Sequence, residues 1–233
     1  MHNLGLSLLI IALLVNSGCK KKEDPVPPAP PASTDPPAVI PAATLGIDWL
    51  TGDPSGPPLD RISASAIFRS SGAGVNVGAV SVNGFNLYWG GSTSTYSNNG
   101  LNPASSGLAT APLEWSIAGD NGYGAMTHQV NDLPIPTVED IMSSDVIVRA
   151  AGYTFHTTPV AGADSVTFDI NGVKQTLAGN ASSCTFTPQQ LSGLSTGYIY
   201  ISVTATKYRR ETIQDKMFEF RRSRSRSAVA EVF

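Results

Sequence analysis

"DSVTFDINGVKQTLAG", residues 164–179, alternates apolar and polar side chains up to one Asn-Gly pair. Val166, Phe168 and Ile170 would share one face of a strand, which is the pattern of a strand with one buried side. Asn171-Gly172 then favours a two-residue hairpin turn, because both central residues of a type I′ turn need a positive φ. The stretch therefore predicts two antiparallel β-strands.

The same pattern occurs in the N-terminal half, where "AVSVNGFNLYW" (79–89) places Asn83-Gly84 between two alternating runs. Almost no segment has helical periodicity, and the exception is one helical turn at 187–194, which Thr187 would cap. Further strands are expected at 112–119, at 197–208 and after Lys216. The sequence therefore predicts an all-β protein.

Composition is typical of an exported β-protein. Only 14% of the residues are charged, against about 25% in a typical soluble domain. Residues 45–136 hold two basic and six acidic side chains, whereas residues 137–233 hold ten and nine. This change, at the "LPIP" segment of residues 133–136, predicts two domains. No long block of one charge occurs, so nucleic acid is not an expected partner.

An apolar run near the N-terminus, "LGLSLLIIALLV" (4–15), has twelve residues. A membrane-spanning helix needs roughly 20, so the run is too short to span a bilayer. Its length suits the apolar region of a secretory signal, which small residues follow before the cleavage site. Ser17 and Gly18 are such residues, and Cys19 comes next.

Ser17-Gly18-Cys19 resembles the end of a bacterial lipoprotein signal, although Asn16 replaces the usual aliphatic residue. The resemblance implies that residues 1–18 are removed and that Cys19 is acylated. "CKKKED" is similar to the start of Bacteroidetes surface lipoproteins, which implies an outer-membrane location on the cell surface. The alternative is an ordinary secretory signal that a cysteine happens to follow.

Residues 19–44 read as a lipid-anchored linker. Residues 20–44 carry eight of the seventeen prolines in the chain. Proline-rich segments favour an extended polyproline II form, so this segment would act as a stalk. The predicted order is a cleaved signal at 1–18, the stalk at 19–44, a β-rich domain at 45–136 and a second β-domain at 137–233.

Residues 137–233 resemble an immunoglobulin-like or fibronectin III-like sandwich. The resemblance rests on Leu191, Leu194, Gly197 and a tyrosine at 198 or 200. The tryptophan and paired cysteines of antibody domains are absent. The fold class expected is therefore all-β, with two β-sandwich-like domains, of which the C-terminal one is Ig-like.

An uncharged stretch in the first domain, "FNLYWGGSTSTYSNNGLN" (85–102), combines aromatic rings with amide side chains. Sugar rings stack on aromatic faces, and amides pair with sugar hydroxyls. The alternative is that the aromatic residues face the core and the asparagines build turns. The candidate glycan-binding residues are Tyr88, Trp89, Tyr96, Asn98 and Asn99.

"RRSRSRS" (221–227) places Arg222, Arg224 and Arg226 on one face of a strand. Such a face could bind an anionic glycan or a lipid head group. Alternatively, the arginines protect an exposed edge strand against aggregation, and this second interpretation is the preferred one.

No spacing typical of a metal site, a phosphate loop or a nucleophilic triad occurs, so neither a metal nor a cofactor is expected. Glu114 and Asp120 form only a weak acid pair for glycoside hydrolysis. Cys184 is expected to be a buried apolar residue without a disulfide partner. "DSV" (164–166) resembles the Bacteroidetes O-glycosylation motif, which would make Ser165 the acceptor.

The function expected is therefore non-enzymatic. The chain would be a cell-envelope lipoprotein that is attached to the outer membrane and binds or displays a glycan or a protein. One alternative is a pilin-like or adhesin-like subunit, which would need a terminal strand that subunits can exchange. A second alternative is a glycan-processing enzyme.

Overall fold

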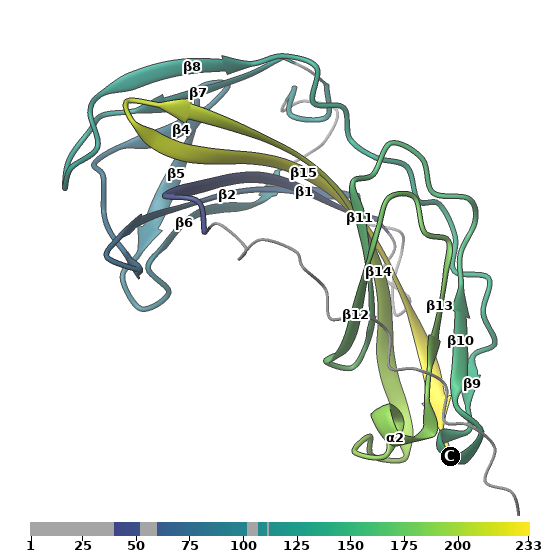
Figure 1. Ribbon diagram of the computed structural model, residues 1–233. Coiled ribbons are helices and arrows are strands. Elements are labelled where there is room, and N and C mark those ends of the chain that lie inside the picture. Colours follow the sequence, from purple (N-terminus) through teal and green to yellow (C-terminus); the bar gives the residue numbers. More distant parts are fainter. Residues whose placement is uncertain (1–39, 52–59, 102–106, 111) are drawn as a thin grey trace, which may run out of the picture. The chain divides into compact units, whose positions relative to one another are not determined.

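The computed structural model describes residues 40–51, 60–101, 107–110 and 112–233. The predicted signal, Cys19 and all but the last five residues of the predicted linker lie outside this part (Figure 1). Ala43 and Thr44, which belong to the predicted linker, form the start of the first strand.

The described residues are nearly all β. The strands of the N-terminal half are β1 (Ala43–Thr51), β2 (Arg61–Ser70), β3 (Ala73–Gly74), β4 (Val80–Val82), β5 (Phe85–Gly90), β6 (Thr95–Leu101), β7 (Leu113–Ile117) and β8 (Met126–Val130). Those of the C-terminal half are β9 (Val146–Ile147), β10 (Tyr153–His156), β11 (Ser165–Ile170), β12 (Val173–Ala178), β13 (Ser183–Phe186), β14 (Gly197–Ile213) and β15 (Lys216–Val232). A 3₁₀ turn, η1 (Arg149–Ala151), and a helix, α2 (Pro188–Leu191), complete the described elements.

Thirteen strands form one mixed sheet in the order β12-β11-β14-β15-β1-β2-β6-β5-β4-β7-β8, with β3 beside β2 and β9 beside β15. β10 and β13 form a second, two-stranded sheet. Two pairings of β15, those with β1 and with β9, are parallel, and all the others are antiparallel. The all-β fold class is confirmed.

Both predicted Asn-Gly turns are present. Asn83 and Gly84 have φ of 45° and 79° and join β4 to β5, and Asn171 and Gly172 have φ of 48° and 96° and join β11 to β12. The helical turn is also confirmed, since the Thr187 side chain caps α2 and accepts a hydrogen bond from the backbone N–H of Gln190.

The longest hairpin, β14–β15, was only partly predicted. Each strand has 17 residues, and all 17 are paired. The turn consists of Gln214 and Asp215, with φ of 49° and 60°. Neither residue is a glycine, so the sequence carries no strong turn motif there. The Gln214 side chain fixes the turn by accepting from the Gly124 N–H and donating to the Ala125 carbonyl, at 3.0 and 3.3 Å.

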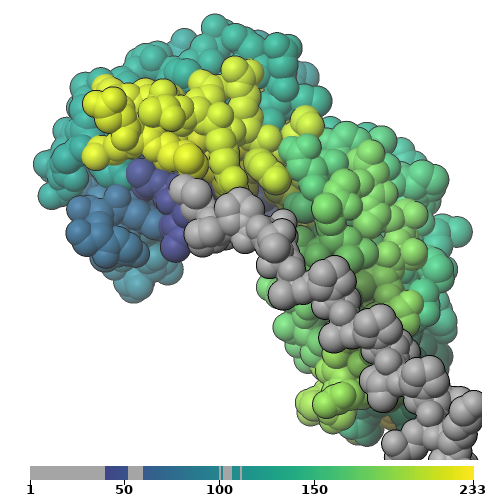
Figure 2. All heavy atoms as spheres, in the orientation of Figure 1, coloured from purple at the N-terminus to yellow at the C-terminus, as the bar shows by residue number. Residues whose placement is uncertain are grey.

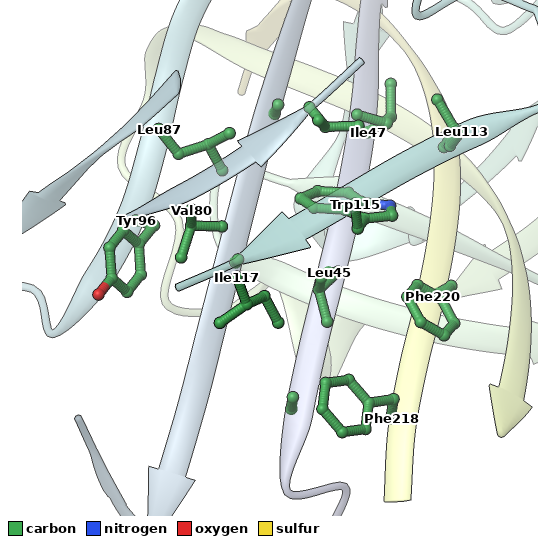
Figure 3. Close-up of a cluster of buried hydrophobic side chains, with 14 of the residues drawn as sticks. Leu45, Ile47, Val80, Leu87, Tyr96, Leu113, Trp115, Ile117, Phe218 and Phe220 are labelled. Carbon is green, nitrogen blue, oxygen red and sulfur yellow. The ribbon is translucent and has the colours of Figure 1, made fainter. Parts of the chain in front are cut away.

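The first hydrophobic core lies between two parts of the same sheet, which folds over itself as in a β-sandwich. Trp115 of β7 is fully buried, together with Leu45 and Ile47 of β1. Phe218 and Phe220 of β15 belong to the same core, as Figure 3 shows. The tip of the C-terminal hairpin therefore completes the N-terminal core.

The second core lies between the large sheet and the two-stranded sheet. Phe155 of β10 packs edge-to-face on Phe168 of β11, with ring centroids 5.3 Å apart. Cys184 of β13 is 6% exposed in this core, which confirms its prediction as a buried apolar residue, and burial raises the pKa of its thiol. This part is a β-sandwich of two facing sheets.

The buried residues up to Leu133 belong to the first core, and those from Val138 onward belong to the second core, with one exception. The exception is the hairpin tip, because Phe218 and Phe220 follow residue 137 in the sequence and pack in the first core. In Figure 2 the hairpin tip, in yellow, lies against the purple and teal N-terminal segments. The proposed boundary at 136/137 stays a prediction.

Candidate functional site

The outer face of the large sheet, which points away from both cores, carries many hydroxyl groups. In the middle of β14 and β15 this face consists of Ser202, Thr204, Thr206, Ser223, Ser225 and Ser227. Pairs across the strands bond to each other, such as Thr204 Oγ1 to Ser225 Oγ at 2.8 Å and Thr206 Oγ1 to Ser223 Oγ at 3.2 Å. These six residues form a polar strip in which Ser223 is buried, and bulkier side chains such as Tyr200 and Arg221 lie on either side of the strip.

A row of directly paired residues crosses this face from β5 to β14. We call it the tyrosine row, and its members are Tyr88, Ser97, Ser65, Gly46, Arg221 and Tyr208. Paired residues in a sheet point to the same side, so Ser97, Ser65, Gly46 and Arg221 lie between the two tyrosines on this face, and three of these four residues are small. With strands about 4.8 Å apart, five steps separate the tyrosines by about 24 Å.

Gly46, which has no side chain, leaves room for the Arg221 side chain on this face. An added Cβ at Gly46 would lie 2.7 Å from Arg221 Nε and 3.0 Å from Arg221 Cγ. The Arg221 side chain therefore lies flat across the glycine, on the strand beside it. Its Nη2 reaches Asp48 Oδ2 at 3.7 Å. The middle of the row thus combines a flat guanidinium with a carboxylate, and both remain partly exposed.

The two tyrosines present their rings to solvent. Tyr88 is 70% exposed and Tyr208 is 40% exposed. The Arg210 guanidinium lies 5.2 Å from the Tyr208 ring centroid, and Arg210 is itself held by Glu219 at 2.8 Å. Tyr208 is therefore the more rigidly placed of the two aromatic residues.

A shallow hollow of about 490 Å³ adjoins the Tyr88 end of the row. Its polar lining consists of Asn86, Ser81, Ser116 and Thr127, which are paired across β5, β4, β7 and β8. Asn86 is two positions before Tyr88 on the same strand, so the hollow and Tyr88 share one face of the sheet. The tyrosine row and the hollow together form the candidate site.

Of the five predicted glycan-binding residues, three are on the core side of the sheet, namely Trp89, Tyr96 and Asn98, which is paired with the buried Ala64. Tyr96 is 1% exposed, and its hydroxyl donates to Asn76 or Gly78 and accepts from the Val77 N–H at 2.7 Å. Burial raises the pKa of Tyr96. Trp89 packs on the first core, with its ring centroid 4.9 Å from that of Tyr96. Neither side chain belongs to the outer face.

Asn98 is nevertheless half-buried, and Tyr88 and Asn99 are exposed. Tyr88 is the exposed end of the tyrosine row. Asn98 donates to the Asn86 carbonyl at 2.8 Å, so its amide supports the β5–β6 pair. Asn99 is exposed. Strand alternation thus divides the five residues between two faces of the sheet.

The sequence did not indicate the other members of the row. Alternation at 197–208 placed Ile199 and Ile201 inward, which leaves Tyr208 outward. Nothing local indicates, however, that Tyr208 shares a row with Tyr88, because that row requires the parallel pairing of β1 with β15.

The three arginines of "RRSRSRS" do share one face, but the edge-strand interpretation is wrong. β15 pairs with β14 on one side and with β1 on the other, so it is an interior strand. Arg222, Arg224 and Arg226 continue the line of Phe218 and Phe220, so they point to the core side of the sheet. Arg222 is only 1% exposed.

The remaining candidates do not form one site in the described residues. Glu114 and Asp120 are both exposed, and His128 of β8 lies 2.9 Å from Glu211 of β14. His156 is on β10, in the other half of the chain. Ser165 is the first residue of β11, half-buried and paired on both sides.

Two classes of feature are absent from the part of the chain that the structure describes. No group of three or more His, Cys, Asp or Glu side chains there could hold a metal ion. Among the same residues, no helix has the length and apolar character needed to cross a membrane.

No protein-family model matches the chain, and no curated protein matches its sequence significantly.

Proposed function

We propose that this chain is a non-enzymatic lipoprotein of the cell envelope whose outer sheet face binds a neutral glycan. The observation that supports the proposal is the tyrosine row, in which Ser97, Ser65, Gly46 and Arg221 lie between two exposed tyrosines. The length of the row, about 24 Å, suits an oligosaccharide rather than a single sugar.

The chemistry of the face fits a neutral sugar chain. Aromatic rings offer flat apolar faces for the apolar side of a sugar ring. Serine and threonine hydroxyls, the Asn86 amide and the Asp48–Arg221 pair supply both donors and acceptors. Arg221 is balanced by Asp48, so the row itself carries no uncompensated charge.

The lipoprotein part of the proposal rests on the N-terminal sequence, which lies outside the described residues. An acylated Cys19 followed by a proline-rich stalk would hold the sheet away from the membrane surface. We expect Cys19→Ala to move the chain from the detergent phase to the aqueous phase in Triton X-114 partitioning. A Cys184→Ala control should stay in the detergent phase, and retention of the Cys19 variant there would contradict acylation.

A glycan array tests the binding part directly. The probe would be the chain from residue 19 with Cys19→Ser, labelled at its N-terminus. We expect binding to neutral oligosaccharides and weak or no binding to the corresponding monosaccharides. An array without signal, or signal only on charged glycans, would contradict a neutral-glycan site.

The pilin-like alternative has one structural observation against it. A subunit that exchanges its last strand needs that strand to be replaceable, but β15 is paired along its length with β14 and along nine residues with β1. It also supplies Phe218 and Phe220 to the first core.

A further inference from the structure

The core-side face of β15 carries three arginines at alternate positions, Arg222, Arg224 and Arg226, which we call the arginine ladder. The ladder lies between Phe220, which belongs to the first core, and Ala230, which belongs to the second. On the neighbouring strand β1, the residues paired with it are Ile47, Trp49 and Thr51. It thus occupies the boundary between the two hydrophobic cores.

The ladder lacks the counter-charges that the other arginines of the same hairpin have. Arg209 pairs with Glu211 at 2.6 Å, Arg210 with Glu219 at 2.8 Å, and Arg221 with Asp48 at 3.7 Å. In the described part of the chain, no acidic side chain forms an ion pair with any of the three ladder arginines. Lys207, which is paired across from Arg222, forms an ion pair with Asp164 at 3.1 Å.

The unpartnered polar atoms at the ladder are all hydrogen-bond donors. The Nε atoms of Arg222, Arg224 and Arg226 are buried and have no acceptor among the described residues, and Trp49 Nε1 is in the same condition. Arg224 stacks on Trp49, with its guanidinium carbon 4.9 Å from the ring centroid. Guanidinium and indole nitrogens donate but do not accept. A ligand that completes this set must supply acceptor atoms.

One member of the ladder is deeply buried. Arg222 is 1% exposed, and only its Nη2 has a described partner, the Thr110 carbonyl at 2.5 Å. Burial lowers the pKa of Arg222 to about 10, because desolvation disfavours the charged form. Arg224 and Arg226 are half-buried, so solvent can reach them from the same face.

We propose that the arginine ladder is an anion site, which binds the oxyanion of a carboxylate, sulfate or phosphate group. Charge-assisted hydrogen bonds from guanidinium groups to such oxygens are short and strong, and the planar guanidinium matches two oxygens at once. A bound oxyanion would also supply the counter-charge that the described protein groups do not provide. The oxyanion would come either from a free inorganic ion or from the acidic group of a sugar acid.

The test is a melting experiment on the full chain, purified in detergent. The probes are sodium sulfate and sodium glucuronate, each compared with sodium chloride at equal ionic strength. We expect a saturable rise in Tm, of about 3–6 °C at ten times Kd. Saturation with sulfate alone identifies a free inorganic ion as the source, and saturation with glucuronate identifies a sugar acid. A Tm that follows ionic strength alone would overturn the proposal.

The matched variants separate a site from a general effect of charge. Arg224→Gln with Arg226→Gln removes two positive charges from the ladder, and Arg209→Gln with Arg210→Gln removes two from the same hairpin outside it. We expect the saturable rise to disappear in the first variant and to persist in the second. Equal responses of the two variants would contradict the site. If the ladder variant does not fold, the single Arg226→Gln should still weaken the apparent affinity at least 5-fold.

Discussion

Replacing Phe220 with alanine is expected to lower the free energy of unfolding by about 3–5 kcal/mol, the range for truncating a buried phenylalanine. Phe220 is fully buried in the first core, although it lies 84 residues after residue 136, the last residue of the predicted first domain. Its ring stacks on His128 of β8 at 5.2 Å and on Phe218 at 6.2 Å. The loss would show that the C-terminal hairpin stabilises the N-terminal core.

Urea denaturation measures this effect, with Tyr198→Ala as the control. Tyr198 is an aromatic residue of the same hairpin and is 77% exposed, so its loss should change the free energy by no more than about 0.5 kcal/mol. Near-equal stabilities of the two variants would contradict the role of the hairpin tip in the first core.

Gly119→Ala is the second change with a large expected effect. We expect it to lower the free energy of unfolding by about 3 kcal/mol or more. Gly119 follows β7 with a φ of +89°, a conformation that side chains rarely adopt. An added Cβ would lie 2.3 Å from Ala125 N and 2.7 Å from Gly124 C. Both atoms are backbone, so no side-chain rotation can relieve the contact.

The control for this change is Gly172→Ala, at the β11–β12 turn. Gly172 also has a positive φ, +96°, but nothing lies within 4 Å of its added Cβ. The Gly172→Ala variant should lose only about 1 kcal/mol of its free energy of unfolding, which is the cost of the backbone conformation alone. Thermal melts of both variants test this prediction. Equal losses of stability would contradict it, because they would mean that the β7–β8 connection shifts to make room for the added methyl group.

Local patterns predicted the strands and the two-residue turns because those signals lie within a few residues of each other. Alternation around Asn171-Gly172 was sufficient for the β11–β12 hairpin. The parallel pairing of β1 with β15 joins Ala43 to Phe218, and no local pattern specifies a partner so far along the chain. The sequence did not indicate the β14–β15 turn for a different reason. Gln214 and Asp215 adopt positive φ without a glycine, so the turn carries no recognisable sequence motif.

The candidate site was predictable only in part. The uncharged stretch at 85–102 led to Tyr88, but it also led to Tyr96, which the same alternation buries. Tyr208 and Gly46 come from strands that meet Tyr88 only through the order β5-β6-β2-β1-β15-β14. The arginines of "RRSRSRS" were assigned to an edge because sequence alone does not give the number of neighbours of a strand.

The most direct test of the account is the affinity of the best oligosaccharide from the array, measured by titration calorimetry. Tyr88→Ala and Tyr208→Ala would be compared with Tyr198→Ala, an exposed tyrosine of β14 outside the row. We predict that each of the first two weakens binding about 10-fold, as expected for the loss of about 1.4 kcal/mol of stacking and contact, and that Tyr198→Ala leaves it unchanged. Unchanged affinity in both row variants would contradict a glycan site on the tyrosine row.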